Sequence, residues 1–258
     1  MTRIIAVSTN KGGCLKTSLT TNIAGVLSLE GKKVLIVDSD NQGNVALSFG
    51  YNPDQFEESL YDVMVHNHNI NNTIININDN IDMIVSNDDM SFLEFDILTN
   101  INNYKNPFYL LRNHLSKISS NYDYILIDSP PNLGLTTGNV LAASHEVLIP
   151  FQPESYSMRS LVKIMTSIKD FKEKHNDRLE VLGIVPTLVD SRTSLHTEVL
   201  QQCRRYAYEN GLKMFDTVIP RSVRFANSVA YHGKPAVLTD KNNNLVQSYF
   251  ELVKEMEL

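Results

Sequence analysis

Near its N-terminus the chain contains the segment Ser8-Thr9-Asn10-Lys11-Gly12-Gly13-Cys14-Leu15-Lys16-Thr17-Ser18. It follows the apolar run Ile4–Val7 and leads into residues Leu19–Glu30, which we predict to be a helix. In this order of strand, glycine-containing turn and helix, the backbone N–H groups of the turn point inward without partners, and the helix dipole adds a partial positive charge. The sequence therefore predicts an anion-binding pocket at the start of the helix.

Two side chains of this segment complete a phosphate site. Lys16 supplies a full positive charge where the terminal phosphates of a nucleotide would lie, and the hydroxyl of Thr17 can hold a magnesium ion that bridges them. The alternative is a glycine turn with two surface lysines, which the preceding strand and the following helix disfavour. We expect the nucleotide to be bound by Lys11, Gly12, Gly13, Cys14, Leu15, Lys16, Thr17 and Ser18.

The segment departs from the common phosphate-loop pattern G-x-x-x-x-G-K-[ST], because Asn10 and Leu15 stand where that pattern has glycines. With its extra Lys11, the sequence K-G-G-x-x-K-T-S resembles the deviant Walker motif of the ParA/MinD group of P-loop ATPases. The resemblance implies ATP and Mg²⁺ as cofactors and a homodimer with ATP at its interface, in which Lys11 reaches the partner's phosphates and Lys16 acts in its own subunit. A loop of inward N–H groups often needs positive φ, which is costly for Leu15.

Length and composition limit the class of protein. The 258 residues fit one large α/β domain, and 42% hydrophobic and 20% charged residues are ordinary values. The net charge of −6 speaks against a generally basic nucleic-acid protein. Cys14 and Cys203 are far apart, which argues against a disulfide framework. With no signal peptide and no apolar run long enough to cross a bilayer, we expect a cytoplasmic protein without a membrane partner.

Apolar runs alternate along the chain with segments of helical spacing, among them Arg159–Lys174 and Ser194–Asn210. This alternation predicts an α/β fold, a mainly parallel β-sheet flanked by helices on both faces, in a single domain over residues 1–258. Residues 67–106 contain twelve asparagines, and we interpret them as a variable region of surface loops and helix ends without an assigned function. The strands are expected at Ile4–Val7, Val34–Val37, Ile81–Val85, Ile125–Ile127, Val147–Ile149, Val181–Val185 and Val218–Ile219.

Aspartates follow two of these expected strands. Asp38 and Asp40 come after Val34–Val37, and Asp128 comes after Ile125–Ile127. The carboxyl ends of parallel strands meet at one edge of a sheet, so these carboxylates should converge on the phosphate loop. Phosphoryl transfer needs an acid near magnesium and a group that orients water. We assign the first role to Asp128, and Asp38 and Asp40 are candidates for the second.

The family resemblance continues through this acidic segment. Its pattern D-x-D-x-Q-G resembles the second motif of the ParA family, which implies that Asp40 positions the attacking water; Asn41 replaces the proline that is usual there. The candidate catalytic residues are thus Lys11, Lys16, Asp40 and Asp38, and the candidate magnesium residues are Thr17, Asp128 and Asp40. An isolated aspartate after a strand is usually a cap or turn former, but three of them in register with a phosphate loop favour a site.

Two segments of the C-terminal half, Val185–Thr193 and Val218–Arg224, also resemble ParA/Soj proteins. The resemblance implies that Thr187, Asp190 and Pro220 flank the adenine. It also implies that three arginines contact DNA phosphates, independently of DNA sequence and with strong salt dependence. Residues 186–235 carry a local charge of +3, although solvated arginines in exposed loops remain the alternative. The three arginines are Arg192, Arg221 and Arg224.

Together the motifs imply a ParA-like ATPase for partitioning plasmid or chromosomal DNA, of the short Soj type without an N-terminal helix-turn-helix extension. ATP–Mg²⁺ would close a sandwich dimer that binds DNA non-specifically and lies on the nucleoid. A ParB-like partner would stimulate a slow hydrolysis of ATP to ADP and phosphate, and the DNA would be released. Nucleotide binding would therefore switch the chain between two states of association.

Other functions on the same loop remain open. A MinD-like membrane ATPase needs a basic amphipathic C-terminal helix, but the helical pattern Leu245–Leu258 has a net charge of −2 and suits packing on the protein. A tyrosine autokinase would carry a C-terminal tyrosine cluster, and only Tyr249 is there. An iron–sulfur reductase needs two suitably placed thiolates in each subunit, and Cys14 and Cys203 are badly placed for this. Leu15 leaves open a nucleotide-dependent DNA-binding regulator that hydrolyses ATP poorly.

Overall fold

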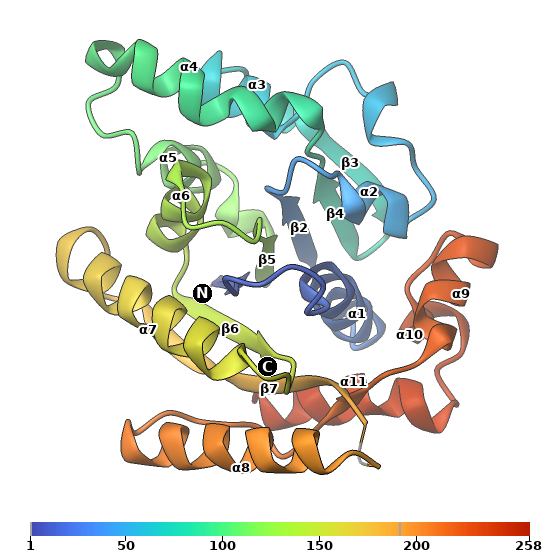
Figure 1. Ribbon diagram of the computed structural model, residues 1–258. Coiled ribbons are helices and arrows are strands. Elements are labelled where there is room, and N and C mark those ends of the chain that lie inside the picture. The colour runs from blue at the N-terminus through green and yellow to red at the C-terminus, as the bar shows by residue number, and fades with distance from the viewer. Residues whose placement is uncertain (1, 191) are drawn as a thin grey trace.

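A computed structural model describes residues 2–190 and 192–258. Its centre is an eight-stranded sheet of order β3-β4-β2-β5-β1-β6-β7-β8 (Figure 1). Neighbouring strands run parallel except β3 and β4, which confirms the mainly parallel sheet expected from the sequence. The strands are β1 (Arg3–Val7), β2 (Val34–Asp38), β3 (Ile74–Asn78), β4 (Ile81–Ile84), β5 (Tyr124–Asp128), β6 (Glu146–Phe151), β7 (Glu180–Val189) and β8 (Ile219–Pro220).

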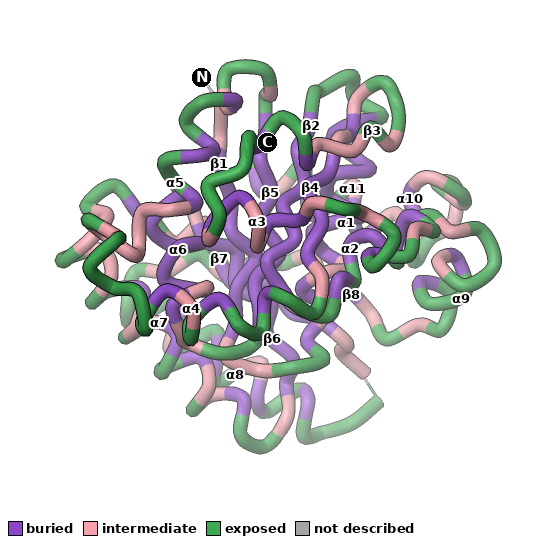
Figure 2. The backbone as a smooth tube through the Cα atoms, turned by 90° about the horizontal axis from the view of Figure 1, so that it is seen from above, coloured by how far each residue is buried: buried purple, intermediate pink, exposed green. Residues whose placement is uncertain are grey.

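Helices cover both faces of the sheet, and each face has its own cluster of buried apolar side chains. The strands form the buried centre, and the exposed backbone lies around it (Figure 2). One face packs against α1 (Lys16–Leu29), α2 (Asn44–Ser48), α9 (Val223–His232), α10 (Ala236–Thr239) and α11 (Asn244–Glu255). The other packs against α3 (Leu60–Val65), α4 (Leu93–Thr99), α5 (Leu110–Leu115), α6 (Leu135–Ala143), α7 (Ser157–Lys174) and α8 (Ser194–Glu209).

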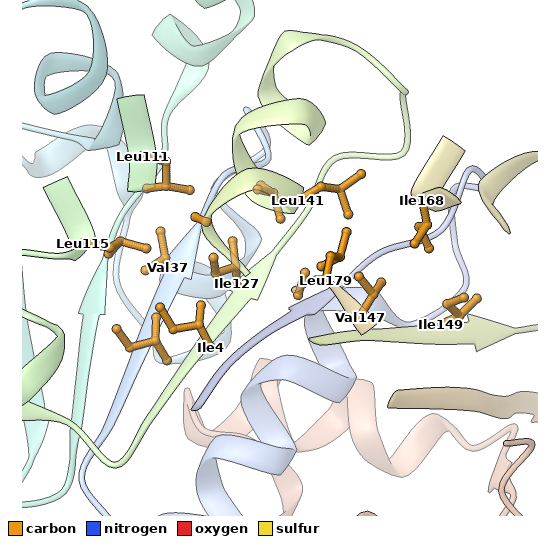
Figure 3. Packing of buried hydrophobic residues seen from close by; sticks show 14 of the residues in the cluster. Ile4, Val37, Leu111, Leu115, Ile127, Leu141, Val147, Ile149, Ile168 and Leu179 are labelled. Atoms are coloured by element: carbon orange, nitrogen blue, oxygen red, sulfur yellow. The ribbon is translucent and has the colours of Figure 1, made fainter. Parts of the chain in front are cut away.

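The near-continuous apolar strands explain this two-sided burial. Successive side chains of a strand point to opposite faces, so Ile4 of β1 joins one cluster and Ile5 joins the other. On the face covered by α3 to α8, Ile4 of β1, Ile127 of β5 and Val37 of β2 share one cluster, and Leu111 of α5 lies near Val37 (Figure 3). Each fully buried side chain of this kind stabilises the fold by about 1.5–3 kcal/mol relative to its exposed state.

The asparagine-rich region contains more regular structure than the sequence indicated. Instead of only loops and helix ends around β4, residues 67–106 include the strand β3 and the helix α4. Asparagine disfavours strands, but β3 pairs antiparallel with β4 alone at the edge of the sheet, where polar side chains are exposed. The apolar residues at alternate positions, Ile75 and Ile77, pack against the buried cluster. Tertiary pairing thus overrides the local preference.

The C-terminal helical pattern is α11, and its apolar face is used inside the protein. Val246, Tyr249, Leu252 and Val253 are almost completely buried, and α11 lies against α1. The hydroxyl of Tyr249 lies 2.9 Å from that of Ser18, so the tail is also tied to the phosphate loop. No helix in the described ranges is both long and apolar enough to span a bilayer.

Candidate nucleotide and magnesium site

The phosphate loop connects β1 to α1 and has the backbone shape that anion binding requires. Leu15 precedes α1 in the left-handed region, with φ 67° and ψ 27°, and Gly13 has φ 73°. Left-handed backbone costs a residue other than glycine about 1–2 kcal/mol. Leu188, with φ 53°, is a second such residue, and both line the same cavity. Backbone strain of this kind clusters at binding sites. The loop therefore has an anion-binding form although Leu15 replaces the usual glycine.

A cavity of about 660 Å³ opens over the loop and the first turns of α1. Its walls include all predicted loop residues from Gly12 to Ser18, together with Asp40. The side chain of Lys16 is almost buried, and its Nζ donates to the carbonyl oxygen of Lys11 over 3.4 Å. Among the ion pairs of residues 2–190 and 192–258 none involves Lys16. Its charge is therefore available to an anion in the cavity.

Asp128 ends β5 directly below the loop. Its Oδ2 accepts a 2.5 Å hydrogen bond from the Thr17 hydroxyl, whereas its Oδ1 is buried without a hydrogen-bond partner. Burial raises the pKa of Asp128 to about 7, and the hydrogen bond from Thr17 and the charge of Lys16 oppose that rise. An orphaned buried carboxylate oxygen next to a hydroxyl is a donor set that suits a hard divalent cation such as Mg²⁺. The residues present fit the predicted metal.

The structure separates the two aspartates after β2. Asp38 is fully buried, and its carboxylate accepts from the backbone N–H groups of Asp40 and Val45, each over 3.0 Å. Burial and the nearby charge of Asp128 raise the pKa of Asp38 well above its usual value. Asp40 instead lines the cavity and accepts from the N–H of Gln42. Asp38 therefore holds the loop after β2, and of the two carboxylates only that of Asp40 lines the cavity.

Lys11 points away from the cavity. Its Nζ lies 2.6 Å from Oε2 of Glu154, in the connection from β6 to α7, and 3.3 Å from the hydroxyl of Ser157, the first residue of α7. Gln152 also donates to Glu154, so the carboxylate is held from two sides. The ion pair lowers the pKa of Glu154 and keeps it ionised. Lys11 is thus partly exposed and lies outside the cavity wall, and its role in another subunit stays a prediction.

The predicted base-flanking residues do not line the cavity. Thr187 is buried, and its hydroxyl donates to the carbonyl oxygen of Cys14, so it supports the phosphate loop from behind. Asp190 pairs with Arg192 over 2.7 Å, which lowers its pKa. Pro220 lies on β8, outside the residues that form the cavity wall. Roles for these three residues in binding adenine stay predictions.

Several cavity residues escaped the sequence analysis. Helix α9 supplies an apolar wall, and its N-terminal cap Ser222 accepts from the N–H of Arg224. The i, i+4 pair Phe225 and Val229 after a capping serine was the available signal, but it does not show which way the helix faces. The other wall residues that were missed are Thr21, Asn22, Gln42, Asn44, Leu47, Ser48, Pro131, Leu188, Ala226 and Ala230.

The raised pKa of Asp128 predicts a pH-dependent stability. In the unfolded chain this carboxyl has a pKa of about 3.9, whereas in the fold it is about 7. Between these values the folded state binds more protons, so the free energy of unfolding falls as pH rises, by up to about 1.4 kcal/mol per pH unit. The contribution is complete below pH of about 4 and lost above pH of about 7.

Urea unfolding across this pH range tests the assignment. Asp128→Asn should flatten the fall in stability, without abolishing it because the pKa of Asp38 is also raised. The exposed Asp54→Asn is the matched control and should leave the pH profile unchanged. An Asp128→Asn profile that matches the parent chain would show that this carboxyl is already ionised in the fold.

Comparison with known proteins agrees with the geometry. An AAA domain family matches residues 2–181. The sporulation initiation inhibitor protein Soj of Bacillus subtilis is 34% identical, over 99% of this chain and 98% of its own. A plasmid partition protein of Borrelia burgdorferi bound to AMPPNP has a TM-score of 0.81, with 25% identity over 100% of this chain and 98% of that one.

A second solved structure carries both of the predicted cofactor types. It is described as cobyrinic acid a,c-diamide synthase from Mycobacterium smegmatis with bound ATP analog and magnesium. Its TM-score is 0.85, with 29% identity over 98% of this chain and 93% of that one. One conclusion follows from the 34% identity to Soj over nearly the full length, together with the parallel sheet and the deviant phosphate loop. The chain belongs to the ParA/Soj-type family of partition ATPases.

Proposed function

We propose that this chain is an ATP hydrolase that partitions DNA by switching between an ATP-bound dimer on DNA and a released form. The carrying observation is the pair of Thr17 and Asp128 below the phosphate loop, with one buried carboxylate oxygen left unpartnered. A nucleoside triphosphate with Mg²⁺ fits this site. The oxygen suits the metal, and the charge of Lys16 and the loop N–H groups suit the phosphates. Relatives crystallised with an ATP analogue, and in one case magnesium, support this ligand.

The residues of the site divide the chemistry between them. Lys16 and the loop hold the terminal phosphates, while Thr17 and Asp128 hold Mg²⁺, which when bound neutralises the charge that develops on the phosphates. Asp40 orients the water that attacks the γ-phosphorus as the bond to ADP breaks. Asp40 is the suitable residue because it lines the cavity, whereas both oxygens of Asp38 already accept backbone hydrogen bonds.

Dimerisation completes the site. Lys11 reaches the phosphates bound by the partner subunit, and to do so it exchanges Glu154 for those phosphates. Its partly exposed position outside the cavity wall supports this role, because its Nζ is bound to the side chains of Glu154 and Ser157 and can leave them for a phosphate. A site that is complete only in the dimer hydrolyses ATP slowly in the monomer, and a ParB-like partner then raises the rate.

The three predicted DNA-contacting arginines are not equivalent in the structure. Arg192 pairs with Asp190 and Arg224 pairs with Asp240. Arg221 is exposed and forms no ion pair within the part of the chain that the structure describes. Binding of Arg192 or Arg224 to a phosphate requires the loss of an existing partner, so Arg221 should contribute most to DNA binding.

We therefore expect Arg221→Glu to weaken binding of unrelated duplex DNA and to lower its salt dependence. Each lost phosphate contact reduces the slope of log affinity against log salt by about 1. The measurement is retention of DNA with ATP–Mg²⁺, with ADP–Mg²⁺ and without nucleotide, across a salt series. Lys33→Glu is the control and should bind as the parent does. Lys33 is exposed just before β2, at the amino ends of the parallel strands and thus opposite the phosphate loop.

Two results would contradict the proposal. DNA retention that is independent of the nucleotide would remove the switch between two states. If Arg221→Glu loses dimerisation and DNA binding equally, Arg221 belongs to the interface between subunits. Dimerisation is measured on the same samples by sedimentation with ATP–Mg²⁺.

In the cell, the ATP-bound form is expected on the nucleoid within the cytoplasm.

A further inference from the structure

Helix α4 has apolar side chains on both of its sides. Leu93 and Ile97 are completely buried in the apolar cluster. Phe92 just before the helix, and Phe95 and Leu98 on its other side, are 57%, 67% and 53% exposed. The solvent-facing side of a surface helix normally carries polar residues, so apolar side chains on this side are unusual. Residues three apart are neighbours on a helix surface, so these side chains form one contiguous patch. We call Phe92, Phe95 and Leu98 the α4 patch; α4 lies at the edge of the molecule beside α3 (Figure 1).

The chain segment that carries the α4 patch is acidic. Between Val34 and Tyr104 the chain contains twelve carboxylates and no lysine or arginine. Because the whole chain carries −6, the remaining residues together carry +6. Asp88 and Asp89 are exposed immediately before the patch, and Glu94 is exposed within α4. A large apolar patch with an acidic rim marks a protein interaction surface, and its charge selects a basic partner.

Glu94, the residue before Phe95, contacts the start of helix α6. The Oε2 of Glu94 accepts a 3.5 Å hydrogen bond from the N–H of Leu135, the first residue of α6. A Cβ added at Gly134 would come within 2.7 Å of this same oxygen, so a larger residue there would displace the Glu94 side chain from this contact. The loop between Asp128 and α6 includes Pro131, which lines the cavity. Glu94, next to the α4 patch, therefore contacts the start of the helix that follows this loop.

We propose that the α4 patch docks a basic, amphipathic segment of a partner protein. Apolar side chains of that segment cover Phe92, Phe95 and Leu98, and its lysines or arginines meet Asp88, Asp89 and Glu94. Docking affects the nucleotide site through the contact of Glu94 with Leu135, because the loop before Leu135 includes the cavity residue Pro131. The inference deepens the proposed function and rests on it only for the reaction that the partner stimulates.

The probe is a fluorescent synthetic peptide of leucine and lysine in an amphipathic helical pattern, with a leucine–glutamate peptide of the same pattern as its counterpart. Phe95→Gln with Leu98→Gln should weaken binding of the leucine–lysine peptide about tenfold or more, because two anchors are lost from the centre of the contact. The matched control is Val162→Gln with Leu195→Gln, which removes comparable exposed apolar residues from α7 and α8. The control should bind as the parent does.

A second variant tests the charge. Asp88→Lys with Asp89→Lys should weaken the leucine–lysine peptide at low salt and reverse the preference toward the leucine–glutamate peptide. Asp170→Lys with Glu173→Lys, exposed on α7, is its control. Equal binding of both peptides to the parent chain, or unchanged binding by the Phe95/Leu98 variant, would overturn the proposal.

Two further measurements on the same samples make the outcome unambiguous. If the parent chain self-associates without nucleotide and the Phe95/Leu98 variant does not, a second copy of the chain covers the α4 patch and the proposal is wrong. Binding of a fluorescent ATP analogue is measured in parallel. A parent chain that binds the leucine–lysine peptide but no ATP would uphold this inference and overturn the proposed function, and the reverse result would overturn this inference alone.

Discussion

Lys16→Ala is expected to abolish ATP binding at working concentrations. Removing one partner of a buried ionic contact costs about 2–5 kcal/mol, which corresponds to roughly a thirtyfold to several-thousandfold loss of affinity. Lys16 is almost buried and takes part in no ion pair in the described ranges, so its charge is not needed to balance a protein carboxylate in a salt bridge. The measurement is titration with a fluorescent ATP analogue in the presence of Mg²⁺.

A local electrostatic effect adds to the loss. The positive charge of Lys16 lowers the pKa of Asp128, which burial has already raised to about 7. Without Lys16 that pKa rises further, more of Asp128 is protonated at neutral pH, and Mg²⁺ has a weaker ligand. Lys33→Ala, exposed at the opposite edge of the sheet, is the control and should bind ATP normally. Normal ATP affinity of Lys16→Ala would place the phosphates elsewhere in the cavity.

The parts of the site that could be predicted are those that local sequence order determines. A strand, a glycine-containing turn and a helix fix the phosphate loop, and parallel strands bring Asp38 and Asp128 to one edge of the sheet. Both aspartates align in the register between β2 and β5, as expected from the carboxyl ends of two apolar runs. From the sequence, the positive φ often needed in such a loop is costly for Leu15, and in the structure Leu15 nevertheless has a φ of 67°.

The remaining contacts join residues far apart in the chain. Lys11 meets Glu154 across 143 positions, and Thr187 meets the carbonyl group of Cys14 across 173 positions. A pattern of apolar and polar residues specifies which side of an element is buried, but it does not specify which distant loop comes to lie beside it. The apolar wall from α9 and the exposed outer side of α4 were missed for this reason.

The distinction between Asp38 and Asp40 is a clear example. In sequence both follow the same strand and both are acidic, so both were candidates for orienting water. In the fold, Asp38 takes two backbone N–H groups and becomes structural, while Asp40 turns toward the cavity. The difference arises from the turn that leads into α2, which local propensity does not determine. Because Asp38 and Asp40 have different contacts, replacing each of them by alanine should have a different effect.

Asp40→Ala is expected to bind ATP–Mg²⁺ and dimerise normally, but to hydrolyse ATP about 10²- to 10⁴-fold more slowly, the range for a positioned acid–base group. Asp40 makes no hydrogen bond to Lys16 or Thr17, so the phosphate and metal contacts survive. Its negative charge raises the pKa of Asp128, so its removal favours the ionised form that holds Mg²⁺. The variant should therefore remain on DNA as an ATP-bound dimer that does not release.

Asp38→Ala provides the comparison that separates chemistry from folding. Its loss leaves the N–H groups of Asp40 and Val45 buried without their present acceptor, which costs about 1–3 kcal/mol for each group. Asp38→Ala should therefore lower the midpoint of urea unfolding, whereas Asp40→Ala should leave it nearly unchanged. Single-turnover hydrolysis and DNA release are measured on both. If Asp40→Ala turns over ATP at the parent rate, the water is oriented by another group, and Gln42, which also lines the cavity, becomes the next candidate.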